Sequence, residues 1–319
     1  MVAATWGTDG SEEFNLKEHV DTIRGRLDEK DYGDIDEVSI LRCLSVVSAD
    51  SARRESILGL REHSNEQLEL LIERARSALT RAVDFLVSQT SVVSNDFLPY
   101  ERQLVLLTYI MAKQSSLSHD NHDVLKRWFW RSSFAERYRA GGEALFDEDL
   151  ARALRALNGA SDLGRFGSPP HRGFFVGSQF RKGAAASKAF AALLGSHHPR
   201  NITNGAHIDV GDALSTYNRR EFHHLFPQKV LKEWEVSRDL ISALANICML
   251  ASSENKLIRD RPPSEYIKEY RAELGDQFDE VMSSNLIPPE AVEYMLVDDF
   301  ANFLDTRSAY LSDVVRDIV

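Results

Sequence analysis

The segment 219–256 constrains the fold of this 319-residue chain more than any other part of it. Two adjacent histidines, His223 and His224, end a short run of strand-forming residues. A second run of this kind, 246–251, follows after a loop, and the serine pair behind it is typical of the start of a helix, which would carry Asn255. The segment therefore predicts a strand, a loop, a second strand and a helix, with imidazole and amide side chains where these elements meet.

The composition is that of an ordinary globular protein, with 43% hydrophobic and 27% charged residues, and the length allows two or three domains, or one large one. The sequence has no signal peptide and no apolar run near the roughly 18 residues that a membrane span needs. Cys43 and Cys248 are too few for a disulfide scaffold or a cysteine-based zinc site. We therefore expect a cytoplasmic protein that does not bind membranes.

The net charge of −11 is unevenly distributed. Acidic residues outnumber basic ones by 12 to 5 in residues 1–50 and by 13 to 4 in residues 264–319, whereas the middle has 24 acidic and 29 basic residues. Between Leu163 and Ile208 there is no acidic residue at all, and the bases there are Arg165, Arg172, Arg181, Lys182, Lys188 and Arg200. Such a local basic surface suits contact with phosphates. The alternative is a connector rich in Gly, Ser and Ala that its cations keep solvated.

Most of the first half is predicted to be helical. In residues 66–86 apolar side chains recur at spacings of three and four residues, which predicts an amphipathic helix. Ser64 or Asn65, immediately before this segment, is a suitable N-terminal capping residue. Further helices are predicted at 100–112, 122–130, 148–157, 264–271, 292–304 and 306–318. Pro99 precedes the first of them, and proline is favoured at the start of a helix. A strand at 174–176 and a short helix at 187–194 are expected between the two halves.

The run 126–138, KRWFWRSSFAERY, has two interpretations. Aromatic rings that alternate with arginines can stack on bases and pair with phosphates. More often such rings belong to the core and the arginine head groups extend outward to water. We favour the second interpretation.

The histidine and asparagine pattern suits phosphodiester hydrolysis. That reaction needs an activated water, relief of charge on the phosphate and stabilisation of the leaving 3′ oxygen. A divalent cation can serve the last two needs, and a neutral histidine, whose usual pKa is about 6.5, can serve the first. Adjacent residues of a strand point in different directions, so one histidine can contact the metal while its neighbour contacts the attacking water.

These residues, in this order and with Leu-Phe-Pro behind the histidines, resemble the ββα-metal motif of the HNH nucleases. The resemblance implies that His224 is the general base and that His223 and Asn255 bind the metal. The resemblance also implies that Asn246 is the middle residue of the motif. We predict that Asn246 and His224 are the catalytic residues, and that Asn246 acts mainly by holding the loop through hydrogen bonds. The cations placed to contact DNA are Lys256, Arg219, Arg220, Arg181, Lys182 and Arg259.

The implied cofactor is one divalent metal ion. Histidine stands at position 223, where HNH nucleases often have aspartate, so we expect modest metal affinity until a phosphate joins the site. Imidazole suits Mn²⁺, Ni²⁺ or Zn²⁺ better than Mg²⁺, but abundance favours Mg²⁺. We expect Mg²⁺ or Mn²⁺, with Ni²⁺ or Zn²⁺ as alternatives.

The segments HHLFP and ANICMLASSENKLIRDRPPSEYI further resemble the C-terminal nuclease domain of the GmrSD-type restriction proteins and the related SspE-like phage-defence proteins. The likeness extends upstream through residues 95–110 and 125–138 and downstream to 303–307, and it covers most of residues 40–319. In those proteins an N-terminal domain binds nucleotide and senses modified DNA. Its DGQQR-like segment is absent here, as is a G-x-x-x-x-G-K-[ST] phosphate loop. We therefore expect a C-terminal fragment, or a stand-alone form, that lacks the sensor domain or acts with it as a partner.

The sequence thus predicts a mainly α protein with an embedded ββα-metal unit and a C-terminal helical cover. The expected divisions are an acidic N-terminal segment (1–39) that is flexible in part, a helical domain (40–158), a basic connector (159–205) and the HNH nuclease unit with its C-terminal helices (206–319). The expected function is metal-dependent cleavage of DNA in restriction of phage or modified foreign DNA. The alternatives are a catalytically silent module that binds a partner or DNA, and an RNase.

Overall fold

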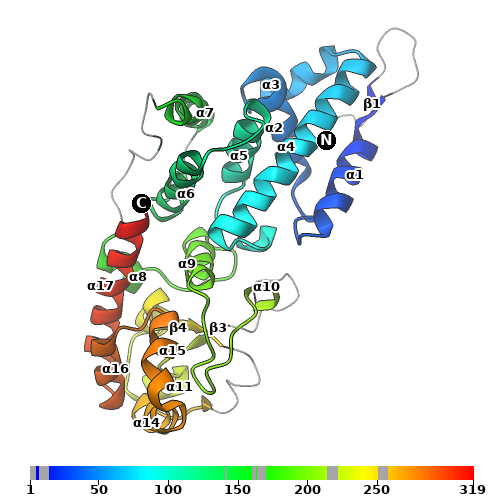
Figure 1. The fold of residues 1–319 in the computed structure, drawn as a ribbon. Helices are drawn as coiled ribbons and strands as arrows, with labels where there is room; N and C mark the ends of the chain where they lie inside the picture. Colours follow the sequence, from blue (N-terminus) through cyan, green and yellow to red (C-terminus); the bar gives the residue numbers. More distant parts are fainter. Residues whose placement is uncertain are drawn as a thin grey trace. The chain divides into compact units, whose positions relative to one another are not determined.

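The computed structural model describes the backbone of residues 5–6 and, in full, residues 14–140, 142–159, 163, 170–213, 222–250 and 258–319. These residues are mainly helical, with two small antiparallel sheets of two strands each, which confirms the predicted helical class (Figure 1). The chain divides into two compact units. Unit 1 comprises residues 1–89, 100–132 and 136–166, and unit 2 comprises residues 90–99, 133–135 and 167–319. No described helix is long and apolar enough to cross a membrane.

Unit 1 contains the sheet β1–β2 and most of the long helices of the N-terminal half. Its elements are β1 (Thr5–Trp6), β2 (Phe14–Asn15), α1 (Leu16–Asp28), α2 (Glu37–Ala49), α3 (Arg54–Gly59), η1 (Leu60–Glu62), α4 (Asn65–Thr90), α5 (Glu101–Lys113), α6 (His119–Phe134) and α7 (Glu143–Leu157). Helix α5 packs against both α2 and α7. Because all residues of α5 from 103 to 111 are buried, this helix forms the centre of the unit's core.

The helices predicted for the first half are confirmed, and α4, α6 and α7 are longer than predicted, whereas α5 is displaced by one residue from its predicted range. Helix α4 begins where its capping signal indicates. The backbone N–H of Gln67 donates to Ser64 Oγ (3.3 Å), and the backbone N–H of Ser64 donates to Gln67 Oε1 (2.9 Å). This reciprocal pair satisfies two donors that the first turn of a helix would otherwise leave unbonded.

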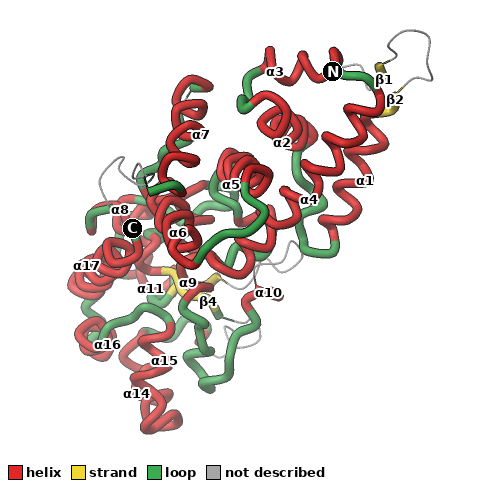
Figure 2. The backbone as a smooth tube through the Cα atoms, turned by 45° about the horizontal axis from the view of Figure 1, so that its top comes forward, coloured by secondary structure: helices red, strands yellow, loops and turns green. Residues whose placement is uncertain are grey.

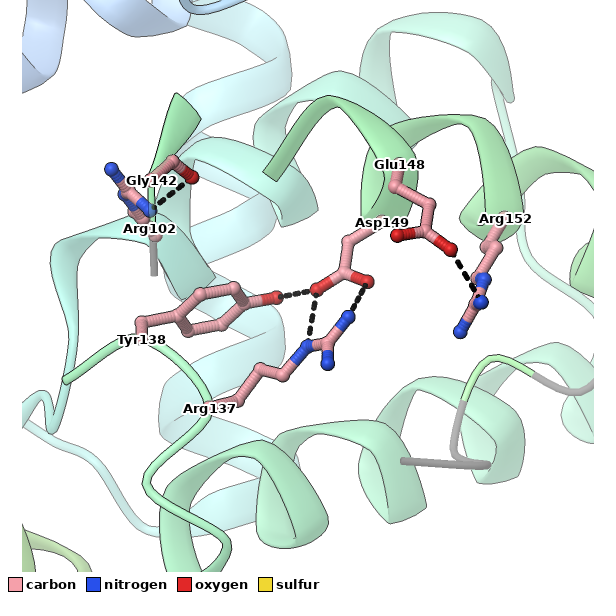
Figure 3. Close-up of polar contacts among 7 residues, drawn as sticks. All are labelled: Arg102, Arg137, Tyr138, Gly142, Glu148, Asp149 and Arg152. Carbon is pink, nitrogen blue, oxygen red and sulfur yellow. Dashed lines mark hydrogen bonds and ion pairs between the residues drawn. The ribbon is translucent and has the colours of Figure 1, made fainter. Parts of the chain in front are cut away.

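The aromatic residues of the run 126–138 belong to the core, as we favoured. Trp128, Phe129 and Trp130 are almost fully buried in α6. Downstream, Asp149 on α7 accepts hydrogen bonds from the Arg137 guanidinium (3.1 and 2.8 Å) and from the hydroxyl of Tyr138 (2.9 Å), as Figure 3 shows. The side chain of Asp149 has no exposed surface, so its charge depends on these donors. The cluster fixes α7 to the turn that follows α6.

Unit 2 contains the second sheet and the helices around it. Its elements are η2 (Asn95–Phe97), α8 (Arg172–Gly177), α9 (Ala185–Ser196), α10 (Val210–Ala213), β3 (Phe222–His224), α11 (Gln228–Glu233), α12 (Arg238–Ile241), η3 (Leu244–Asn246), β4 (Ile247–Met249), α14 (Pro263–Leu274), η4 (Gly275–Gln277), α15 (Phe278–Ser284), α16 (Pro289–Leu296) and α17 (Phe300–Ile318). Helix α17 packs against α8 and α16, and α9 packs against β4 and η2.

Three sequence predictions need correction. Residues 174–176 are not a strand but lie in the short helix α8. The predicted helices 292–304 and 306–318 are divided at the wrong place, since α16 ends at Leu296 and α17 is continuous from Phe300. The physical reason is the acidic pair before α17. Asp298 adopts a left-handed conformation that ends α16, and Asp299 caps α17 by accepting from the backbone N–H of Asn302 (3.1 Å).

The two segments that flank the predicted helical domain contain packed helices. The acidic N-terminal segment contains α1, which buries Leu16, Val20, Ile23 and Leu27 along one face. The second part of the predicted connector contains α9, whose residues 189–195 are all buried, so this part belongs to the core of unit 2. Alanine and glycine have small side chains, which suits the buried position of α9. The short helix predicted at 187–194 is thereby confirmed.

Candidate functional site

The two predicted strands around the histidines form a small antiparallel hairpin (Figure 2). In its register His223 lies opposite Cys248 and His224 lies opposite Ile247. This confirms the two strands and their order, but the connection between them contains the short helices α11 and α12 and is not only the expected loop. The helix expected to follow, with Asn255, lies in residues 251–257, outside the described residues.

Asn246 holds both sides of the loop between the strands. Its Oδ1 accepts from the backbone N–H of Phe226 (2.9 Å), and its Nδ2 donates to the carbonyl oxygens of Phe226 (3.2 Å) and Ile241 (2.9 Å). Its own carbonyl oxygen accepts from the backbone N–H of Leu225 (2.8 Å). The side chain is fully buried. Asn246 therefore has the geometry of the loop-holding residue that the sequence predicted, and it does not line the groove described below.

Arg307 on α17 fixes the second strand from behind. Its guanidinium is fully buried and donates to the carbonyl oxygens of Ala245 (2.9 Å), Ile247 (2.8 Å), Leu286 (3.1 Å) and Asn285 (2.9 Å). Burial lowers its pKa to about 10, so the side chain is a cation at neutral pH. No acidic partner is among these contacts. Four carbonyl dipoles instead compensate the charge.

Tyr266 on α14 holds the residue that follows the histidines. Its buried hydroxyl donates to the carbonyl oxygen of Leu225 (2.5 Å). Phe226, the next residue, packs its ring against Phe300 and Phe303 of α17, with ring centroids 5.1 and 4.9 Å away. The backbone behind the histidine pair is thus fixed by polar and aromatic contacts from two helices.

His223 and His224 both line an open groove of about 340 Å³. His224 is half-buried, and burial is the main cause that lowers its pKa to about 4, with the neighbouring His223 and Lys232 as further causes. It is therefore neutral at physiological pH. The side-chain nitrogen of Gln228 lies 3.2 Å from His224 Nε2. With this amide N–H as the donor, Nε2 is the acceptor and the ring proton lies on Nδ1.

The groove also has a basic rim. The other side chains that line it are Pro227, Gln228, Lys229, Lys232, Arg259 and Asp260. Lys229 forms an exposed ion pair with Asp260 (3.3 Å). Three cations thus face the groove against one carboxylate. This arrangement favours an anionic ligand beside the two imidazoles.

The predicted DNA-binding residues fall into three groups. Arg259 lies at the groove with the histidines. Arg181 and Lys182 lie instead at a neighbouring pocket that shares the strand β3. Arg219, Arg220 and Lys256 lie outside the described residues, as do Asn255 and Arg165. Two other bases of the connector are engaged elsewhere, because Arg172 pairs with Asp305 (3.2 Å) and Arg200 pairs with Glu280 (3.1 Å).

The described residues do not by themselves form a metal site. Within the described ranges, no group of three or more His, Cys, Asp or Glu side chains is arranged to hold a metal ion. The imidazole of His223 is a suitable ligand at the groove, and the amide of Asn255, its expected partner, is not described. Of the two predicted metal ligands, the structure therefore describes His223 alone.

Several residues of the site were not found from the sequence. Arg307 and Tyr266 support the hairpin, and Gln228 and Lys232 contribute to the groove. Gln228 and Lys232 have a sequence signal, because they directly follow the His-His-Leu-Phe-Pro segment and begin a helix. Arg307 has none, since an arginine in an amphipathic helix is usually at the surface.

These features define a mainly helical protein of two units, in which unit 2 carries a histidine-bearing hairpin at a basic groove. No protein-family model matches the sequence. The chain is 20% identical to the uncharacterized protein MJ0686 of Methanocaldococcus jannaschii over 231 aligned residues. The aligned region covers 64% of this chain and 39% of that protein. The chain thus spans less than half the length of this relative.

Proposed function

We propose that this chain is a metal-dependent endonuclease of the HNH type that hydrolyses phosphodiester bonds in DNA. The observation that carries the proposal is the neutral, half-buried His224, which lies beside His223 at a basic groove on a hairpin held by Asn246. A neutral imidazole accepts a proton, and the cations around it suit a phosphate.

In the proposed reaction, His224 Nε2 takes a proton from a water molecule. The water oxygen attacks the phosphorus and the bond from phosphorus to the 3′ oxygen breaks, which leaves a 5′ phosphate and a 3′ oxygen that is then protonated by solvent. Gln228 is exposed and contacts Nε2, so the attacking water would take the place of its amide group. Lys232 and Arg259 would contact the charged phosphate oxygens.

A divalent cation, Mg²⁺ or Mn²⁺, would be held by His223 and Asn255 and would reduce charge on the phosphate and on the leaving oxygen. His223 lies at the groove, where such an ion could contact the bound phosphate. Its neighbour His224 points differently from the same strand, which suits the division of roles between the two residues.

The biological role that we propose is restriction of phage or modified foreign DNA, in company with a nucleotide-binding sensor domain. This part rests on the resemblance to the GmrSD-type and SspE-like proteins. The chain covers only 39% of its archaeal relative, a protein with room for further domains.

Incubation of supercoiled plasmid with the purified protein and Mg²⁺, Mn²⁺ or EDTA tests the activity. We expect nicked or linear product with the metals and none with EDTA. A single-stranded RNA of the same length as a DNA oligonucleotide, assayed in parallel, separates the DNase from the RNase alternative. Absence of cleavage under all conditions, together with tight DNA binding, would support the catalytically silent module instead.

A further inference from the structure

Three half-buried phenylalanines line a second cavity in unit 2. Phe97 comes from η2, Phe180 from the loop between α8 and α9, and Phe222 from β3. The ring centroid of Phe222 lies 4.9 Å from that of Phe180 and 6.0 Å from that of Phe97. The cavity has a volume of about 200 Å³, below the roughly 300–1,000 Å³ of pockets for drug-sized molecules. It therefore suits a single planar ring system. We call it the aromatic pocket.

Cations surround the aromatic pocket. Arg181, Lys182 and Lys188 line it, against one carboxylate, Asp96. The Arg181 guanidinium is oriented by Gln179, whose Oε1 lies 2.9 Å from Arg181 Nε. Lys182 is exposed, and the described part of the chain gives it no ion pair. The edge of the pocket therefore attracts a negatively charged group while its walls offer aromatic faces.

The aromatic pocket and the groove share one strand. Phe222 lines the pocket, and His224 lines the groove two residues further along β3. Alternate residues of a strand lie on the same face, at a distance of about 7 Å along the strand. A ligand bound in the pocket would therefore lie next to His224, the proposed general base.

We propose that the aromatic pocket binds one unstacked base of the DNA strand, next to the phosphate that is cleaved. This inference rests on the proposed nuclease function and adds how the substrate is held. Aromatic side chains stack on the face of any base, and Arg or Lys beside them contacts the backbone. Phe97, Phe180 and Phe222 are half-buried at the cavity, whereas Phe175 and Phe190 are fully buried in the core. The pocket thus selects single-stranded or locally opened DNA without reading its sequence.

Equilibrium binding in EDTA tests this inference without any cleavage. Fluorescence anisotropy would compare a labelled single-stranded DNA oligonucleotide with an abasic oligonucleotide of equal length, which keeps the phosphates and lacks the bases. We expect the protein to bind the normal oligonucleotide about five- to hundredfold more tightly. Phe180→Ala should remove most of this difference, whereas Phe180→Tyr should retain it. Phe174→Ala, which removes a half-buried ring of α8 outside the pocket, is the matched control.

Equal affinity of the unmodified protein for the two oligonucleotides would overturn the inference, whatever the variants do. Deoxynucleoside monophosphates that bind as tightly as the oligonucleotide would also overturn it, because they would make the ligand a free nucleotide. Because the assay contains no metal, its result is independent of the cleavage assay. Loss of base-dependent binding and loss of cleavage are therefore separate outcomes.

Discussion

At the scale of single residues, the histidine pair depends on buried polar side chains that never reach the groove. Asn246, Arg307 and Tyr266 donate to or accept from backbone groups on both sides of the loop. A buried polar group costs free energy unless it is hydrogen-bonded, and here each bond is made to the chain segment that positions the histidines. These three residues therefore couple the stability of unit 2 to the geometry of the proposed site.

Arg307 provides the sharpest test of this coupling. Lysine keeps the charge but has a single nitrogen, which cannot contact four carbonyl oxygens as the planar guanidinium does. We expect Arg307→Lys to lower the free energy of unfolding by about 3 kcal/mol, as measured by urea denaturation. Arg316→Lys, an exposed change on the same helix, should cost less than about 0.5 kcal/mol. Equal stability of the two variants would show that the buried contacts of Arg307 contribute little.

The sequence predicts the residues at the groove better than the residues that support them. Adjacent histidines and an asparagine before a strand form a local pattern, so His223, His224 and Asn246 could be selected from it. Arg307 and Tyr266 act across more than 40 residues of chain, and their side-chain types are common on exposed helix faces. Only the tertiary packing of α14 and α17 shows that they are buried.

At the scale of elements, local signals located most helices but not all of their ends. The spacing of Leu16, Val20, Ile23 and Leu27 is that of an amphipathic helix, α1. The segment around α1 is rich in acidic residues, so its composition alone does not indicate a packed helix. Residues 174–176 are apolar and short, a pattern that does not distinguish a strand from a buried helical turn. The predicted boundary inside α17 is wrong because the helix starts at its capping residue, Asp299, and the apolar spacing does not mark this position.

The capping box of α4 gives a prediction at this scale. Ser64→Ala removes the acceptor of the Gln67 N–H and should lower the free energy of unfolding by about 1 kcal/mol. Ser88→Ala, on the same helix, is the matched control. The Ser88 hydroxyl donates back to the carbonyl oxygen of Asp84 (2.7 Å), a contact that does not support helices, so its removal should be neutral. Thermal denaturation followed by circular dichroism would measure both, and equal shifts would contradict the capping role.

At the scale of the whole molecule, the two units contain different features. Unit 2 contains the hairpin, the groove and the aromatic pocket, whereas unit 1 contains the buried cluster of Asp149, Arg137 and Tyr138 (Figure 3). The net negative charge of the chain does not oppose the proposed DNA binding, because cations line the groove and the pocket of unit 2.

A change in unit 1 should therefore affect stability and not the proposed chemistry. Asp149→Ala leaves the Arg137 guanidinium and the Tyr138 hydroxyl without their acceptor, and we expect a loss of about 3 kcal/mol in the free energy of unfolding. Glu148→Ala, which breaks only a surface pair with Arg152, should cost less than about 1 kcal/mol. The rate of DNA cleavage, measured well below the unfolding temperature, should be unchanged in both. A specific loss of cleavage in folded Asp149→Ala protein would place part of the site in unit 1.

The central claim is that His224 is the general base, and the rate of DNA cleavage by His224→Ala tests it most directly. The matched control is His207→Ala, an exposed histidine of the same unit that does not line the groove. With Mg²⁺ or Mn²⁺ present, we expect the first variant to lose at least about 100-fold in cleavage rate while it binds DNA normally, and the second to keep the full rate. Cleavage by purified His224→Ala within a few-fold of the unmodified protein would contradict the proposed function of this residue.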